Sequence, residues 1–188
     1  MAIWMLGLLG VLLFTLGTNA TPNLPDFNVN KLAGKWYMSG TVSGAGWIED
    51  PTWMKWSSVL IVTPIANAEM QMKSSVKFPL SSSKFGCLIV IHTLKKTKTP
   101  ETFLLNGLYY NPSTDVTFLD VKYDEYVIIQ NKRTTKENVT YNLVLYTRTP
   151  VVSKDVNKKF TQVVRKEKFD PDKTVFLPYQ GTTQGECN

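Results

Sequence analysis

The side chains with the most distinctive chemistry in this chain are two cysteines, Cys87 and Cys187, and a single histidine, His92. A metal site needs three or four Cys, His, Asp or Glu ligands at characteristic spacings, and the sequence contains no such set. It also lacks a Ser-His-Asp order and a pattern of paired carboxylates. The sequence therefore predicts neither an enzyme nor a cofactor. It leaves two interpretations of His92 open: a polar, pH-sensitive anchor for a bound carboxylate, or a histidine that is simply tolerated in its place.

Residues 1–20 are typical of a secretory signal peptide, because residues 3–16 are almost wholly apolar and small residues follow them. Lys and Arg are missing ahead of the apolar run, which is atypical. A membrane anchor is the alternative, but the run is short for a bilayer. We expect cleavage near Thr21, one mature domain over residues 21–188, and an extracellular location.

Secretion gives the two cysteines a role, because disulfides form in oxidising compartments. Cys87 and Cys187 have one intramolecular pairing, which would close a loop of roughly 100 residues; two free thiols are the alternative. Asn138 begins the sequon Asn-Val-Thr, so we expect a glycan there.

The net charge is +6, and basic residues gather in three short runs, at 95–98, 132–136 and 158–168. Such runs attract anionic ligands, membrane surfaces or nucleic acid, or they simply solvate the surface. Because stacking aromatics are not interleaved with them, we expect no nucleic-acid partner. No later segment approaches about 20 apolar residues, so we also expect no membrane span.

Eight segments with the alternation or β-branched composition of strands recur about every 10–12 residues. They lie at 35–43, 57–65, 70–76, 85–94, 101–110, 115–123, 125–131 and 139–148. The period then changes to that of an amphipathic helix, which Ser153 caps and whose apolar stripe is Val156, Phe160, Val163 and Val164. A short strand at 174–178 follows. The pattern predicts an all-β fold: an eight-stranded up-and-down antiparallel barrel, or else a sandwich, with one C-terminal helix outside.

Three short segments carry a family resemblance. The first is Gly34-Lys35-Trp36-Tyr37, after a possible helical turn and ahead of a strand; the second is Tyr123-Asp124-Glu125-Tyr126; the third is Arg148 at the end of the eighth strand. In this order they resemble the lipocalin family over the whole mature chain, although the Thr-Asp that usually opens the second segment is missing. The resemblance implies that Arg148 stacks on Trp36 at the closed end of the barrel. It also implies a disulfide from the fourth strand to the C-terminus.

The barrel implied by this resemblance would enclose one small ligand. Period-two alternation from Trp36, Arg148 and Cys87 predicts a ligand-binding wall that is aliphatic, rich in methionine and sparsely polar. Its members are Met38, Val59, Ile61, Met70, Met72, Val90, His92, Val116, Phe118, Ile129, Asn131, Asn142, Val144 and Tyr146. The same alternation predicts that Gly40, Val42, Leu94 and Val127 face inward. It also predicts that Tyr141, Leu143 and Leu145 face outward beneath the helix.

This wall predicts a secreted, monomeric carrier of a fatty acid, retinoid, steroid or odorant-like molecule, with a core filled by side chains as the alternative. Prostaglandin-D-synthase activity in the family requires a free cysteine near the start of the second strand, and residues 55–59 hold none. Siderophore capture requires three inward basic residues; the matching positions are His92, Arg133 and Asn142, of which Arg133 alone is basic. A third alternative is a cell-surface receptor that docks on the loop containing Trp47, Ile48, Trp53 and Trp56.

Overall fold

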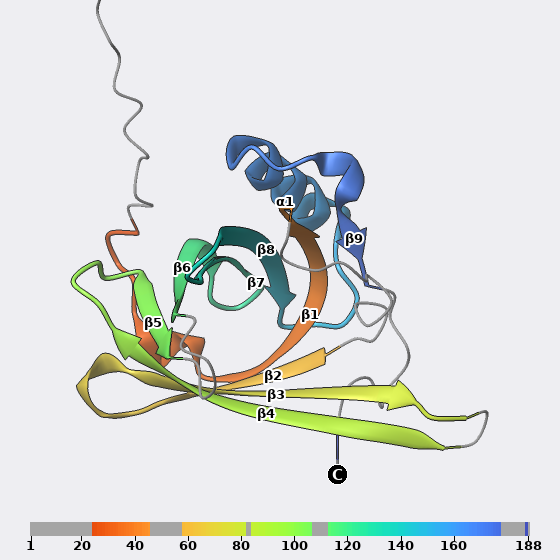
Figure 1. The fold of residues 1–188 in the computed structure, drawn as a ribbon, viewed down its shortest axis with the longest axis horizontal. Coiled ribbons are helices and arrows are strands. Elements are labelled where there is room, and N and C mark those ends of the chain that lie inside the picture. The colour runs from red at the N-terminus through yellow and green to blue at the C-terminus, as the bar shows by residue number, and fades with distance from the viewer. Residues whose placement is uncertain (1–23, 46–57, 82–83, 107–112, 178–186, 188) are drawn as a thin grey trace, which may run out of the picture.

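The computed structural model describes residues 24–45, 58–81, 84–106, 113–177 and 187. Within these ranges the chain forms an antiparallel sheet that curls into a ring, with a single α-helix outside it (Figure 1). The strands are β1 (Gly34–Ser43), β2 (Ser58–Pro64), β3 (Met70–Pro79), β4 (Phe85–Lys96), β5 (Thr102–Asn106), β6 (Ser113–Lys122), β7 (Tyr126–Thr134), β8 (Val139–Thr147) and β9 (Val175–Phe176).

The ring is a closed eight-stranded barrel of the kind that the sequence predicts. Strands β2 to β8 pair with their neighbours in chain order, and β1 closes the ring by pairing with β8 and, through Trp36 and Leu60, with β2. Closure pairs each barrel strand with a neighbour on both sides over at least part of its length, which limits the unpaired edges that invite aggregation. The ninth strand, β9, pairs with the second half of β1, at Gly40 and Thr41, beyond the stretch that β2 occupies.

Helix α1 (Lys154–Lys166) follows the predicted amphipathic pattern. The Ser153 hydroxyl accepts a hydrogen bond from the Val156 backbone N–H, which caps the first turn. The predicted stripe is buried in an outer hydrophobic cluster with residues of β1, β7 and β8: Val42, Ile128, Leu143, Leu145, Val156, Phe160, Val163 and Val164. The helix therefore covers one side of the barrel. Among the described residues, no helix is both long and apolar enough to cross a bilayer.

The chain enters the barrel through a tight turn at its closed end. A 3₁₀ helix, η1 (Val29–Leu32), occupies the predicted helical turn, and the Trp36 indole N–H donates to the Leu32 carbonyl at 2.8 Å. Gly34 has φ +100°, a backbone conformation that side chains disfavour. These contacts fix the direction of β1 and place Trp36, which is fully buried, in the floor of the barrel.

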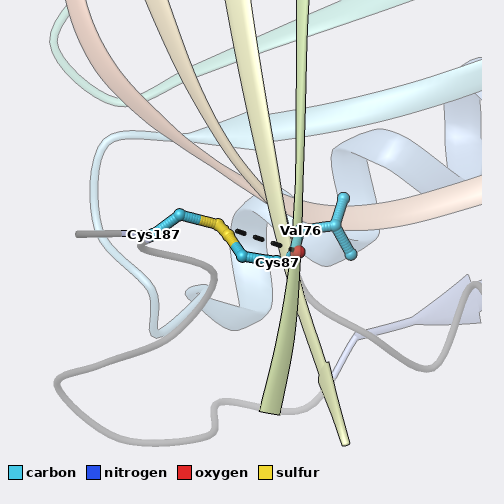
Figure 2. Close-up of a disulfide and its surroundings, with 3 residues drawn as sticks. All are labelled: Val76, Cys87 and Cys187. Carbon is cyan, nitrogen blue, oxygen red and sulfur yellow. Dashed lines mark hydrogen bonds between the residues drawn. A yellow bond between two sulfur atoms is a disulfide. The ribbon is translucent and has the colours of Figure 1, made fainter. Parts of the chain in front are cut away.

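The predicted disulfide joins Cys87 of β4 to Cys187, with 5.9 Å between their Cα atoms. Figure 2 shows the bridge beside Val76 of the neighbouring strand β3, whose carbonyl oxygen lies 3.9 Å from the Cys187 sulfur. Both cysteines of the chain are consumed by this bond. The C-terminus is therefore fixed to the wall of the barrel.

One bulge in β1 overturns part of the predicted inward set. Met38 pairs with Tyr146 but Gly40 pairs with Leu145, so Ser39 is an extra residue in β1 and the alternation changes phase after it. Gly40 and Val42 therefore face outward, and the prediction that they face the interior was wrong. A side chain at Gly40 would meet the rings of Phe160 and Phe176 within 3.3 Å.

Candidate ligand-binding site

The interior of the barrel is lined by one large hydrophobic cluster. Cross-strand partners share a face of the sheet, so the pairing of Met72 with His92, and of Met70 with Leu94, carries the inner face from β3 to β4. The buried members of the cluster are Val29, Leu32, Trp36, Leu60, Val62, Met70, Met72, Leu94, Phe103, Val116, Phe118, Val127, Ile129 and Val144. Met38 and Tyr146 pack against it while remaining partly accessible.

Most of the predicted wall residues lie on this inner face. Strands β3, β6, β7 and β8 contribute Met70, Met72, Val116, Phe118, Ile129, Asn131, Asn142, Val144 and Tyr146 by cluster membership or by register. Val90 and His92 share the face with Ser74 and Met72. On β8 the predicted outward residues Leu143 and Leu145 lie in the outer cluster under α1.

In strand β2 the residues that face inward are the alternate set to the predicted one. Trp36 pairs with Leu60, so Leu60 and Val62 face inward. Ile61 is 40% exposed on the outer face, and Val59, although buried, lies on that same face outside the interior cluster. The prediction that these two residues face the ligand was wrong. Every residue from Val59 to Val62 is apolar, so alternation could not indicate the phase, which the pairing with β1 decides.

The sequence interpretation also missed residues at the closed end. Phe27, from the segment ahead of β1, packs its ring 5.1 Å from that of Phe118 and 6.0 Å from that of Phe103. Phe103 of β5 is fully buried, and Leu105 packs beside it in the same cluster. The alternation of β5 could have identified Phe103 and Leu105, but nothing local to Phe27 indicates that it reaches the core.

Polar side chains, among them an asparagine pair, a tyrosine and a histidine, interrupt the apolar wall. The Asn131 side-chain amide donates to the Asn142 side-chain oxygen at 2.8 Å, across β7 and β8. Burial raises the pKa of the Tyr146 phenol to about 12, so this group is a neutral hydroxyl at physiological pH. Burial also lowers the pKa of His92 from its ordinary value, which favours the neutral imidazole. The wall therefore offers hydrogen bonds without fixed charge.

Tyr146 packs against the interior cluster and is still partly accessible. Its phenol is enclosed deeply enough for burial alone to raise its pKa, yet part of the residue remains accessible to a sphere the size of water. Both observations hold if Tyr146 lines an internal space rather than the outer surface. The partial accessibility of Met38, on the strand paired with it, agrees with this interpretation.

Arg148 closes the floor of the barrel, as the family resemblance implies. Its guanidinium lies 3.7 Å from the centre of the Trp36 ring. It donates three hydrogen bonds to backbone carbonyls: Nε to Tyr123 at 2.9 Å, and its two terminal nitrogens to Lys35 at 3.0 Å and Lys31 at 3.2 Å. Burial lowers the pKa of Arg148 from its ordinary value. One side chain thus joins the β6–β7 turn, η1 and the start of β1.

Comparison with known proteins gives the family. The family model described as lipocalin / cytosolic fatty-acid binding protein matches residues 33–181, well over half of the chain. The chain belongs to the lipocalin family. A lipocalin of Rhinella marina is 25% identical over 88% of this chain and 87% of its own length. The prostaglandin-H2 D-isomerase of Ursus arctos is 26% identical over 95% of this chain and 91% of its own length.

Among solved structures, the siderocalin Ex-FABP superposes with a TM-score of 0.66 at 20% sequence identity, over 81% of this lipocalin and 93% of that chain. A likeness at that identity concerns the fold. Lipocalins bind small hydrophobic ligands in the barrel, and the interior described above has the apolar lining that such binding needs. Within the described residues, no three Cys, His, Asp or Glu side chains gather as a metal site would require.

The second family segment departs from the usual pattern but still contacts the segment ahead of β1 and Arg148 in this lipocalin. The Tyr123 hydroxyl accepts a hydrogen bond from the Asn28 N–H at 2.7 Å, and the Tyr123 carbonyl accepts one from Arg148. Lys122, which replaces the usual aspartate, pairs with Glu125 at 2.7 Å. The loop with Trp47, Ile48, Trp53 and Trp56, and the predicted signal peptide, lie outside the described residues.

Proposed function

We propose that this lipocalin is an extracellular, monomeric carrier that reversibly binds one small hydrophobic or amphipathic molecule inside the barrel. The observation that carries the proposal is Tyr146, which is enclosed by protein and yet accessible, on a wall that is mostly apolar. Burial of apolar ligand surface drives binding, at about 25 cal/mol per Å² before the costs of association. The methionines Met38, Met70 and Met72 adapt to varied ligand shapes, which favours modest selectivity.

The charge of the wall favours a ligand whose polar group is neutral. Arg133 lies at the open rim and Lys96 at the closed end; between them, the inward-facing residues of the described strands carry no formal charge. Asn131 donates one of its two amide hydrogens to Asn142, so each side chain of the pair can form further hydrogen bonds. A hydroxyl or carbonyl group fits these partners and the Tyr146 phenol. We therefore favour a retinoid alcohol or steroid over a fatty-acid anion.

We propose that the chain is not an enzyme, although several relatives are named prostaglandin-H2 D-isomerase. A thiolate mechanism needs a free cysteine, and both cysteines of this chain are bonded to each other. Nor do we propose siderophore capture. Asn142 carries no positive charge, and the lowered pKa of His92 disfavours the cation that a trianionic iron complex would need.

The experiment compares two neighbouring positions of β4. Val90 faces inward, whereas Ile91 is 50% exposed on the outer face. We expect Val90→Trp to fill the hollow and weaken binding of the neutral fluorophore N-phenyl-1-naphthylamine at least about tenfold, a loss of about 1.4 kcal/mol. Ile91→Trp is the matched control and should bind the fluorophore like the wild type. Displacement by retinol but more weakly by retinoic acid would support the neutral-group assignment.

Two outcomes would contradict the proposal. Absence of fluorophore binding by the wild type would favour a filled core, and equal weakening by both tryptophans would place the site outside the barrel.

Secretion and glycosylation belong to the same proposal. Asn138 is exposed in the β7–β8 turn, where a glycan can attach without disturbing the core. Mass spectrometry of protein secreted from animal cells should find an N-terminus near Thr21 and a glycan on Asn138.

A further inference from the structure

A second concave surface lies outside the barrel, between the C-terminal half of α1 and the outer face of β6, β7 and β8. We call it the α1 groove; its volume is about 840 Å³. A row of polar side chains crosses its floor, because Thr102 pairs with Thr117 and Thr117 with Gln130. These residues face away from the barrel interior. The α1 groove is therefore separate from the hydrophobic site described above.

The α1 groove is ringed by cations. Two of the basic runs in the sequence, 132–136 and 158–168, approach each other here although they belong to a hairpin and to a helix. The lining holds five lysines: Lys132, Lys159, Lys166, Lys168 and Lys173. Three carboxylates accompany them: Asp120, Glu167 and Asp170. The excess within the lining is two positive charges.

All three carboxylates already have partners within the protein. Asp120 forms an ion pair with Lys159 at 2.8 Å. Glu167 accepts a hydrogen bond from the Gln130 amide at 3.4 Å. Asp170 caps the 3₁₀ helix η4 (Pro171–Lys173) by accepting the Asp172 N–H at 3.0 Å.

The remaining cations are not neutralised in this way. In the part of the chain that the structure describes, no ion pair engages the other four lysines of the lining: Lys132, Lys166, Lys168 and Lys173. Lys166 also lies in the last turn of α1, where a cation offsets the negative end of the helix dipole. Lys132, Lys168 and Lys173 lie outside the helix. Their charge is available to an anionic ligand.

We propose that the α1 groove binds a linear sulfated polysaccharide. Cations spread around the rim of a groove suit a chain with many anionic groups better than a single small anion. Beyond the lining, Lys136 is exposed in the β7–β8 turn that follows the strand of Lys132. The hydroxyls of Thr102 and Thr117 and the amide of Gln130 on the floor match the hydrogen-bonding groups of sugars.

Two other polyanions fit the described lining less well. A flat membrane surface does not enter a concave groove, and the lining residue Val163 is already buried in the outer cluster under α1. Single-stranded nucleic acid binds through stacking aromatics as well as cations. In the described lining the aromatic rings are those of Tyr141, which is 38% exposed, and Phe169, which packs against the outer cluster.

The test uses the full mature chain and a heparin-derived octasaccharide, with binding measured by calorimetry at several salt concentrations. The groove variant is K132Q/K168Q/K173Q, which leaves the last turn of α1 intact. The matched control K73Q/K84Q/K96Q removes the same charge from β3, β4 and the segment between them. We expect the groove variant to lose about tenfold or more in affinity and the control about twofold or less. The salt dependence of the groove variant should be shallower, by roughly one unit of slope per lost contact.

Several results would overturn the proposal. The first is an equal loss of octasaccharide affinity in the groove variant and the control. The second is wild-type protein that binds a desulfated octasaccharide as tightly as the sulfated one. The third is wild-type protein that does not bind the sulfated octasaccharide at low salt. Tighter groove-dependent binding of an oligonucleotide or of phosphatidylserine vesicles would assign the α1 groove to that partner instead. The comparison with the desulfated octasaccharide uses wild-type protein, so it tests the proposal even if a variant misfolds. N-phenyl-1-naphthylamine should bind the groove variant normally, which separates this proposal from that of the barrel carrier.

Discussion

Replacement of Arg148 tests whether one guanidinium holds the closed end of the barrel together. Its three hydrogen bonds end on the carbonyls of Lys31, Lys35 and Tyr123, which belong to three segments. At this partly exposed site each bond contributes about 0.5–1.5 kcal/mol net, the range of an ordinary hydrogen bond, and the contact with Trp36 about 1 kcal/mol. The carbonyls can partly rehydrate because the site is half-exposed, so we expect Arg148→Met to lower the free energy of unfolding by about 2–4 kcal/mol.

Arg148→Lys separates charge from geometry. An ammonium keeps the positive charge over Trp36 but cannot direct planar donors at three carbonyls at once. We expect this variant to recover less than half of the loss, leaving it about 1.5–3 kcal/mol below the wild type. For a domain of this size, each kcal/mol corresponds to about 2–4 °C in Tm. The exposed Arg165→Met is the control, and it should change stability by about 0.5 kcal/mol or less.

The assay is equilibrium unfolding in urea, followed by both tryptophan fluorescence and far-UV circular dichroism. Coincident transitions would justify a two-state free energy. If Arg148→Lys unfolds at the wild-type urea concentration, charge alone suffices and the hydrogen-bond argument is wrong. If Arg148→Met matches Arg165→Met, the closed end does not depend on this side chain at all.

The remaining predictions concern the bridge, a buried phenol and a helix cap. Cys87→Ser with Cys187→Ser should cost about 4–5 kcal/mol of stability, because the bond closes a loop of about 100 residues; a loss below about 1 kcal/mol in urea unfolding would contradict this. Tyr146 has a folded-state pKa of about 12, above the ordinary 10.0, so its contribution is fully present below pH 10 and is lost as the pH rises through 12. Tyr146→Phe should therefore lose less stability than the wild type between those pH values, as measured by urea unfolding, and lack one high-pH transition in ultraviolet absorbance. Ser153→Ala should cost about 1 kcal/mol by leaving the Val156 N–H without its cap, and Ser153→Asp, which can still accept that bond, should restore stability.

Several elements could be predicted from local sequence because their physical cause is local. The stripe Val156, Phe160, Val163 and Val164 has helical spacing next to a capping serine, and the helix forms there. Alternation along β3 indicated its inner face, because polar and apolar residues take turns there, whereas the inner face of β8 was counted from Arg148. The three family segments placed Arg148 over Trp36 although 112 positions separate them in the numbering.

The phase of β1 and β2, by contrast, was decided by the tertiary structure. The bulge at Ser39 lies where β1 passes from pairing with β2 to pairing with β9, and no local residue pattern records that change of partners. In β2 every residue from 59 to 62 is apolar, so pairing with Trp36 chose between two equivalent faces. The α1 groove likewise depends on long-range packing, because α1 brings two basic runs together against the barrel.

Sequence by itself determined which segments form strands and a helix and what chemistry the interior has, since those follow from near neighbours. The tertiary structure decided which face each apolar strand turns inward and which distant charges share a surface, because closure of the ring and docking of the helix select the partners.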